Sequence, residues 1–191
     1  MIRFLNDETV AGYRYGKGAI SRFDDVTEAI LIAQGDAEDY PAVTKPVEVL
    51  ASSAVAASCA LTATDEVLGS FTVHAGIIGV NSILQIEPVW TFSSSANNKI
   101  LKVRVDGVTV YGATRTMSVK EAPLIVLANR NSLRAQIQPY DNAYVTAGSD
   151  TPATYTINFA NSVTFDITGQ RASNGDALKL EYYRVLHFVG D

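Results

Sequence analysis

The sequence of 191 residues holds a single cysteine, Cys59, and only two histidines, His74 and His187. One thiol excludes an intrachain disulfide, and a thiolate zinc cage cannot be assembled from one chain of this composition. We therefore expect a protein that is compatible with folding in a reducing cytoplasm and that needs no cofactor.

The sequence also lacks an excess of basic residues and any long apolar run. Its formal net charge is −5, which gives no electrostatic drive toward nucleic acid phosphates. The best candidate for a membrane span, residues 47–63, is rich in alanine and is interrupted by Glu48 and several hydroxyl residues. The first residues show no basic flank leading into an apolar stretch, so no secretory signal is expected. We expect neither nucleic acid nor membrane among the partners.

What the sequence does have is a globular composition with an uneven charge. Hydrophobic residues make up 47% and charged residues 18% of the chain. Residues 1–66 contain eleven acidic and five basic side chains, whereas residues 67–191 contain nine and ten. This asymmetry indicates a small acidic N-terminal module over residues 1–39, a linker over residues 40–66 and a larger domain over residues 67–191.

The N-terminal module is expected to be β-rich with one helix. Short strands are predicted around residues 2–5, 13–15 and 19–23, with a glycine turn at residues 16–18. A helix of about ten residues is predicted after Asp24-Asp25, which can cap it, and Gly35 is a natural C-cap. The apolar spacing of this helix rests on Val26, Ala29, Ile30 and Ala33.

The linker carries Pro41 and Pro46, which favour extended geometry at themselves and at the preceding residues. The Ala- and Ser-rich stretch 51–63 is compatible with an extended connector, a first strand, or a helix that forms only against a partner.

From residue 68 onward the pattern is typical of β-structure. The Asp106-Gly107 pair between two alternating runs predicts a β-hairpin. About nine strands without intervening helices favour an antiparallel β-sandwich in a jelly-roll order, and disfavour parallel α/β folds. The predicted strands cover residues 70–74, 83–92, 100–105, 108–111, 124–128, 133–140, 155–159, 163–167 and 178–189.

Several stretches of the chain resemble β-sandwich modules of phage virion proteins. They are Ser-Phe-Thr-Val-His-Ala-Gly at 70–76, Ser-Ile-Leu-Gln-Ile at 82–86, Trp-Thr-Phe-Ser-Ser-Ser-Ala-Asn-Asn-Lys at 90–99 and Val-Arg-Val-Asp-Gly at 103–107. Residues 3–5, 13–18 and 29–37 are similar to small modules of phage head and head-completion proteins. The resemblance implies a capsid decoration (cement) protein, a head fibre or a tail-fibre module, and it carries over no catalytic residue.

Residues with catalytic or metal-binding potential are few. His74 and His187 lack the cysteine or carboxylate cluster that a metal site needs, and structural roles fit them better. No Gly-x-Ser-x-Gly nucleophile elbow is present. The adjacent acids, Asp24 with Asp25 and Asp65 with Glu66, fit a helix cap or a solvated turn better than a glycosidase pair. We expect no enzyme activity and no metal.

Aromatic side chains and polar loops are the candidates for binding. Trp90, Tyr111, Tyr182 and Tyr183 are assigned to the core or an oligomer interface, with sugar stacking as the alternative. Tyr182 and Tyr183 point to opposite faces of one strand, so at most one of them is core. Candidate ligand loops contain Asn97, Asn98 and Asp150.

These observations lead to three functional hypotheses. The first is a capsid decoration or head-fibre protein on the virion surface, made in the host cytoplasm, with the major capsid protein and itself (homodimer or homotrimer) as partners. The second is a tail-fibre or receptor-binding module that recognises a host surface glycan. The third, a carbohydrate-active enzyme, requires glycan cleavage that depends on a single carboxylate.

Overall fold

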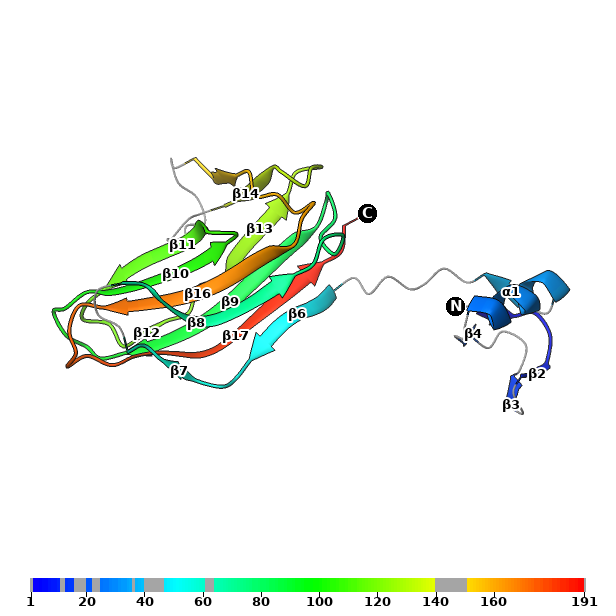
Figure 1. Cartoon of the computed structure of the whole chain (residues 1–191), viewed down its shortest axis with the longest axis horizontal. Coiled ribbons are helices and arrows are strands. Elements are labelled where there is room, and N and C mark those ends of the chain that lie inside the picture. Colours follow the sequence, from blue (N-terminus) through cyan, green and yellow to red (C-terminus); the bar gives the residue numbers. More distant parts are fainter. Residues whose placement is uncertain are drawn as a thin grey trace. The chain divides into compact units, whose positions relative to one another are not determined.

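A computed structural model describes residues 2–10, 13–15, 20–21, 25–35, 37–39, 47–60, 64–139 and 151–190. The chain forms two compact units, Met1–Thr44 and Lys45–Asp191 (Figure 1). Each unit buries apolar side chains of its own, so each is described by itself.

The smaller unit contains short strands and the expected helix. Strand β1 pairs in antiparallel fashion with β4 and with β5, and β2 pairs with β3. Phe4, Leu31 and Ala37 form its buried cluster, and Tyr15 stacks on Phe4 with ring centroids 4.9 Å apart. The elements are β1 (Ile2–Phe4), β2 (Glu8–Val10), β3 (Tyr13–Tyr15), β4 (Ile20–Ser21), α1 (Asp25–Gln34) and β5 (Ala37–Asp39).

Helix α1 confirms the predicted helix but not its buried face. Gly35 ends it with φ +79° and donates its N–H to the Ile32 carbonyl, as a C-cap does. Ala29 and Ile30, which the spacing placed inward, are exposed, and Leu31 is buried instead. Apolar residues run without interruption from 29 to 33, so helical spacing exists on more than one face and periodicity alone could not select the inner one.

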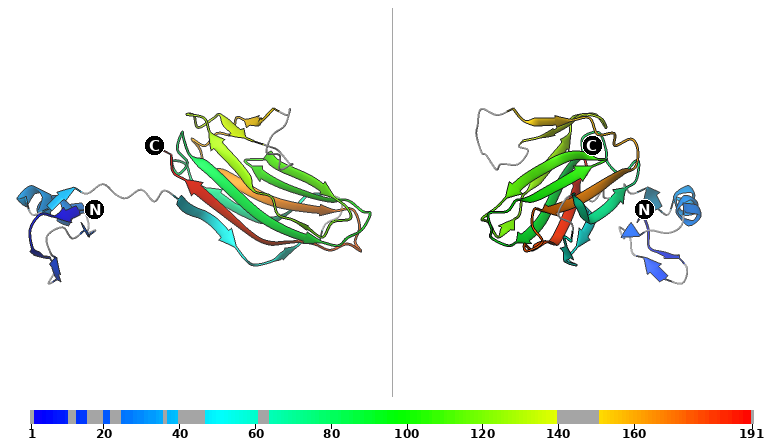
Figure 2. Two further views of the ribbon diagram at one scale, coloured as in Figure 1. Left: turned by 180° about the vertical axis from the view of Figure 1, so that it is seen from behind. Right: turned by 60° about the vertical axis from the view of Figure 1, so that its left-hand side comes forward.

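The larger unit is a β-sandwich of two antiparallel sheets that face each other (Figure 2). One sheet has the order β11-β10-β16-β8, and the other has the order β15-β14-β13-β9-β17-β6, with β7 on β17 and β12 on β9. The strands are β6 (Val47–Ser53), β7 (Ala57–Ser58), β8 (Glu66–Val73), β9 (Ile83–Phe92), β10 (Lys99–Val105), β11 (Val108–Arg115), β12 (Lys120–Glu121), β13 (Ile125–Asn129), β14 (Gln136–Gln138), β15 (Ala153–Tyr155), β16 (Val163–Arg171) and β17 (Leu178–Phe188).

The pairing of the long strands follows the jelly-roll order. Strand β6 pairs with β17, β8 with β16, β9 with β13, and β10 with β11, so the first strand meets the last and the pairs nest inward. The chain is thus one long hairpin wrapped around a common core, which confirms the mainly β, jelly-roll-like sandwich.

The core lies between the sheets and comes from strict alternation along the strands. On β10, Leu101, Val103 and Val105 are fully buried, as the sequence pattern predicted. Burial of each such side chain contributes about 1.5–3 kcal/mol. The other strands contribute the same kind of side chain, among them Leu84, Ile86, Trp90, Phe92, Ile125, Leu127, Val163, Phe165, Ile167, Leu178, Leu180 and Val185.

The stretch whose conformation the sequence left open is a strand where the structure describes it. Six of the seven residues of Val47–Ser53 pair with β17, and Ala57–Ser58 pairs with the far end of the same strand. Residues 47–60 therefore belong to the sheet of the larger unit rather than to a linker, while residues 40–46 lie outside the described part. Small Ala and Ser side chains have little β propensity, so tertiary pairing decides this edge strand.

Two predicted strands differ from the structure. The run 133–140 was predicted as one alternating strand, but the strand covers only Gln136–Gln138, and its two glutamines are buried. Gln136 is satisfied there, since it donates to Asn129 Oδ1 at 3.0 Å and accepts from the Ile157 N–H at 2.9 Å. The run 155–159 is a strand only up to Tyr155. In the run 155–159 the apolar residues Ile157 and Phe159 are buried, although the strand ends before them.

The hairpin at Asp106-Gly107 is confirmed. Both residues have positive φ, 51° and 78°, as a two-residue type I′ turn requires. The Gly107→Ala variant is therefore expected to lose about 1 kcal/mol of unfolding free energy, because a side chain is strained at this φ.

The matched control is Gly112→Ala on β11 of the same hairpin, where a Cβ meets nothing closer than 3.7 Å and φ is not positive. Urea unfolding followed by circular dichroism measures both variants. Equal stabilities of the two would contradict the turn assignment.

Candidate functional site

Two of the aromatic residues assigned to an interface lie inside the sandwich. Trp90 is 0% and Tyr111 4% exposed, and their rings stack with centroids 6.2 Å apart. They therefore offer no surface to a second subunit or a sugar, and their role is in the core of this chain. A tryptophan in a strand looks the same in sequence whether its face of the strand is covered by its own chain or by a partner.

The Tyr111 hydroxyl lies in a small polar cluster at the edge of the core. It donates a hydrogen bond to Glu121, which also binds Arg115 through Nε at 2.6 Å and Nη2 at 2.8 Å. Burial, reinforced by Glu121, raises the pKa of the Tyr111 phenol. Burial pulls the pKa of Glu121 upward, yet the hydrogen bonds from Arg115 and Tyr111 outweigh it and hold that pKa below its usual value. The cluster thus ties β11 to β12 with a charged carboxylate.

Tyr182 and Tyr183 separate as the alternation required. Tyr183 packs against the core and stacks on Phe71, with centroids 6.1 Å apart. Tyr182 is 45% exposed on the opposite side of the sheet. A register shift between Leu180 and Tyr182 in the pairing with β9 sets which of the two tyrosines points outward. Tyr182 is therefore the one aromatic residue of the four that presents a large surface to solvent.

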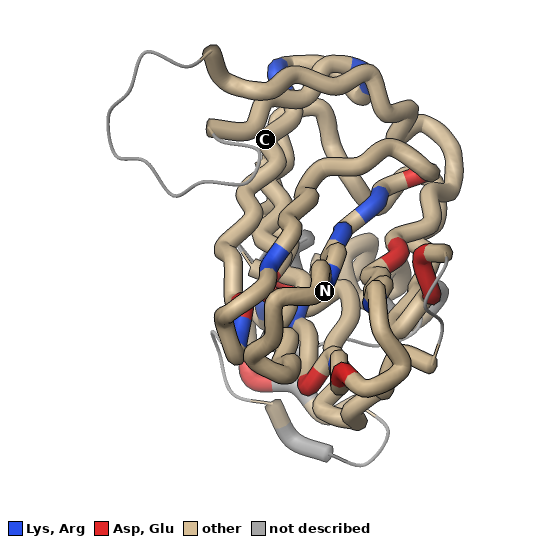
Figure 3. The backbone as a smooth tube through the Cα atoms, turned by 90° about the vertical axis from the view of Figure 1, so that its left-hand side faces the viewer, with Lys and Arg blue, Asp and Glu red and all other residues tan. Residues whose placement is uncertain are grey.

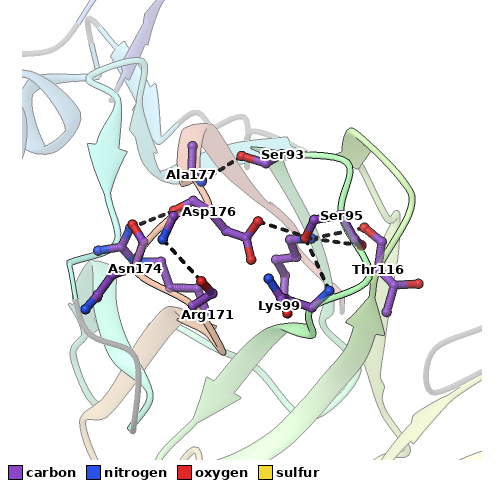
Figure 4. Close-up of polar contacts among 11 residues, drawn as sticks. Ser93, Ser95, Lys99, Thr116, Arg171, Asn174, Asp176 and Ala177 are labelled. Atoms are coloured by element: carbon purple, nitrogen blue, oxygen red, sulfur yellow. Dashed lines mark hydrogen bonds and ion pairs between the residues drawn. The ribbon is translucent and has the colours of Figure 1, made fainter.

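The candidate ligand loop with Asn97 and Asn98 is exposed, and its base is held by a buried lysine (Figure 4). Lys99 is 0% exposed, and its Nζ donates to Ser95 Oγ at 2.6 Å and to the Thr116 carbonyl at 3.1 Å. Asp176, from the β16–β17 connection, lies 4.0 Å from the same ammonium. This brings three connections to one end of the sandwich, whereas Asp150, the other loop candidate, lies outside the described residues.

The groups around Asp176 favour the charged form of its carboxyl and lower its pKa. A hydrogen bond from Ser95 lowers its pKa most, burial opposes this, and Asn97, Lys99 and Arg171 add to the lowering. Arg171 also donates to the Asp176 carbonyl at 2.6 Å, which fixes the connection itself. The arrangement orders the loops around Asn97. It offers a rigid, polar rim rather than a reactive group.

The two histidines do not meet. His74 is exposed, whereas His187 is buried with its Nε2 2.8 Å from Ser82 Oγ and its Nδ1 3.5 Å from a carboxylate oxygen of Glu48. The order serine, histidine, carboxylate is that of a hydrolase, but Ser82 is only 1% exposed and its hydroxyl accepts the Gly79 N–H at 2.8 Å. The arrangement fastens the β8–β9 connection to β17 and gives a substrate no access to the hydroxyl.

No group of three or more metal-ligating side chains occurs among the residues that the structure describes. Among those same residues, no helix is long and apolar enough to cross a bilayer. Basic and acidic residues both occur along the backbone (Figure 3). Lys102 and Arg104 of β10, for example, both bind Asp65, the former at 2.7 Å.

The sequence indicates that the apolar runs 124–128 and 178–189 need cover on both faces, as a closed homo-oligomer provides. It does not locate the surface concerned, which is the solvent side of the larger sheet and which we call the outer face. Along β9 and β17, Leu84, Ile86 and Val185 point into the core, so their neighbours point outward. Strand pairing places these neighbours in two rows, of which all members but Gln85 are apolar. The rows are Val47, Phe188, Ile83 and Ala128, followed by Val49, Leu186, Gln85 and Val126.

The outer face is exposed in the described part of the larger unit. Val49 is 61%, Val47 41% and Ile83 39% accessible to solvent. Beyond the two apolar rows lies an ion pair in which Arg184 Nη2 contacts Glu87 Oε2 at 2.5 Å. A hollow of about 310 Å³ adjoins it, lined by Ser52, Ser53, Ala54, Glu87, Tyr182, Tyr183 and Arg184. Only the strand pairing shows that these distant positions share one surface.

Comparison with known proteins identifies no family, since no family model and no curated protein matches the chain. Three solved structures are among those similar to it. The dimeric latent PorU of Porphyromonas gingivalis is 11% identical, with a TM-score of 0.34 over 74% of this chain and 12% of that one. The CBM2 module of the evolved Dit of Lactobacillus casei BL23 phage J-1 is 12% identical, with a TM-score of 0.34 over 64% and 70%.

The third is the infectious bursal disease virus Gt strain, 15% identical, with a TM-score of 0.29 over 93% of this chain and 39% of that one. The chain thus spans 12% of the PorU chain and well under half of the viral one. The neighbours include a phage module and a virus particle, but likeness of this degree assigns no function.

The Asp176 carboxylate yields a pH-dependent prediction. Because its folded pKa lies below the ordinary 3.8, its contribution to stability is complete above that value and is lost as the pH falls through the lowered one. The Asp176→Asn variant is therefore expected to unfold at lower urea than the parent at pH 7, and the gap should narrow as the pH falls below about 4. Urea titrations across this range measure it. A gap that stays constant down to about pH 2 would contradict the assignment.

Proposed function

We propose that this chain is a non-enzymatic structural protein of a phage virion, which decorates the outer shell of the capsid and stabilises it. The outer face carries the proposal. An exposed surface of two rows that are apolar except for Gln85 is unusual for a monomeric protein and marks a surface used in assembly. The polar sites at the sandwich ends, by contrast, are built to hold loops in place.

In this proposal the two units have different roles. The smaller unit, with the acidic excess of the N-terminal third, docks on the major capsid protein, and the sandwich holds neighbouring copies together. Exposed Ile30 and Ile32 on α1 give the smaller unit an apolar contact of its own. Weak individual contacts suffice, because the symmetric repetition of sites on a shell multiplies their effect.

A receptor-binding module on a tail fibre is the second candidate, and one observation favours it. The loop with Asn97 and Asn98 is exposed, while Lys99 and Asp176 beneath it hold its base in one conformation. A preformed polar loop loses little conformational entropy on binding, as recognition of a surface glycan requires.

Electron microscopy of particles mixed with gold-labelled protein distinguishes the two candidates. We expect regular label over the shell at symmetry positions, because decoration uses equivalent sites on the capsid lattice. Label only at the tail, or on host cells, would contradict decoration and favour glycan binding by the loop at Asn97.

The division of roles predicts the behaviour of the isolated larger unit. A protein beginning at Lys45 contains the whole sandwich with its core, so it is expected to fold but to lose shell binding. Co-sedimentation with particles measures the loss, and circular dichroism verifies the fold. Undiminished sedimentation of this shorter protein would assign the docking surface to the sandwich instead.

A further inference from the structure

The two apolar rows of the outer face have the composition of a protein interface core. These rows are followed by Arg184 and Tyr182, and these are residue types that are enriched at the energetic centres of interfaces. Lysine, which interfaces avoid, is absent from the described positions of both rows. A covering partner must therefore present apolar side chains at the spacing of a β-sheet, opposite a mixed charge pair.

The size of this surface matches that of a specific interface. Strand β17 has eleven residues, which corresponds to a length of about 35 Å, and four adjacent strands span about 19 Å. The whole solvent side of these strands therefore measures about 650 Å² per molecule, with the apolar rows at the end near Phe188 and the exposed Lys179 at the other end. Two such faces in contact bury about 1,300 Å², which lies within the range of stable protein–protein interfaces.

The charged pair on this face is complementary to the same pair on a second copy of the chain. Arg184 and Glu87 lie opposite each other on β17 and β9, and the arginine side chain is 51% exposed. A two-fold axis beside this pair places Arg184 of each molecule toward Glu87 of the other, so that four charges alternate in sign. The apolar face of one sheet packs well on that of another sheet, and the same face of a second copy provides one.

We propose that a second copy of this chain covers the outer face, and that the protein is an isologous dimer with its two larger sheets packed face to face. This inference rests on the proposed function, because decoration of a shell brings many copies of the chain together. In this proposal the interface residues include Val49, Leu186 and Tyr182. Trp90 and Tyr111 are not among them, because they are buried in the core.

Light scattering coupled to size exclusion, on the full chain over a range of concentrations, tests the dimer. The parent protein is expected at twice the chain mass of 20.5 kDa. Val49→Lys places an uncompensated ammonium in the interface and is expected to weaken dimerisation roughly tenfold or more. The matched control is Val67→Lys on β8, the edge strand of the other sheet, where the valine is 53% exposed and should tolerate lysine with no change in mass.

Charge reversal provides an independent test. Arg184→Glu sets like charges against each other across the two-fold axis and is expected to give monomers, and the double variant Arg184→Glu/Glu87→Arg is expected to restore dimers. Urea unfolding of each variant separates loss of association from loss of folding. If Arg184→Glu lowers stability without changing the mass of the native protein, the pair acts only within one chain and the proposal is overturned.

The outcomes separate this inference from the proposed function. A parent protein that is monomeric or trimeric but still labels shells overturns the face-to-face dimer alone. A dimer sensitive to Val49→Lys that labels no shell supports the interface and refutes decoration. If Val49→Lys abolishes shell binding and leaves the mass unchanged, a capsid protein covers the face, and the second copy is excluded.

Discussion

The structure of the larger unit depends on the pairing of β17 (Leu178–Phe188). This last strand lies between β9 and β6, so it joins the end of the chain to the start of the sandwich and closes the nested jelly-roll order. Its inward side chains, such as Leu180 and Val185, complete the core, and its outward ones, such as Leu186 and Phe188, build the outer face. The register shift beside Tyr182 keeps both patterns in phase. A slip by one residue would exchange core and surface along the whole strand.

That arrangement explains why this sandwich is an assembly protein in our account. The inner faces of the two sheets form the hydrophobic core. The polar clusters at Lys99, Glu121 and His187 are enclosed and hold loops or strands in place. The apolar side chains on the outer face contribute little to the folding of a single chain, because they remain accessible. Their cost in solubility is offset only when another surface covers them.

The sequence predicted most of the fold because alternation and turn chemistry are local. Asp106-Gly107 and the alternating run from Leu101 to Val105 specify a hairpin whatever surrounds them. Tertiary pairing decided the rest: Val47–Ser53 is a strand only because β17 accepts it, and Gln136 is buried only because Asn129 and Ile157 satisfy it. The candidate site was beyond local reasoning for the same reason. Val49, Leu186 and Val126 are far apart in sequence, and strand pairing alone makes them neighbours.

A cryo-electron microscopy reconstruction of decorated particles, at a resolution that separates β-strands, tests the central claim most directly. The account predicts sandwiches on the shell in pairs, with β17 of each copy facing β17 of the other across a local two-fold axis. A reconstruction in which the outer face of the sandwich is open to solvent, or in which no density for the chain lies on the shell, would contradict it.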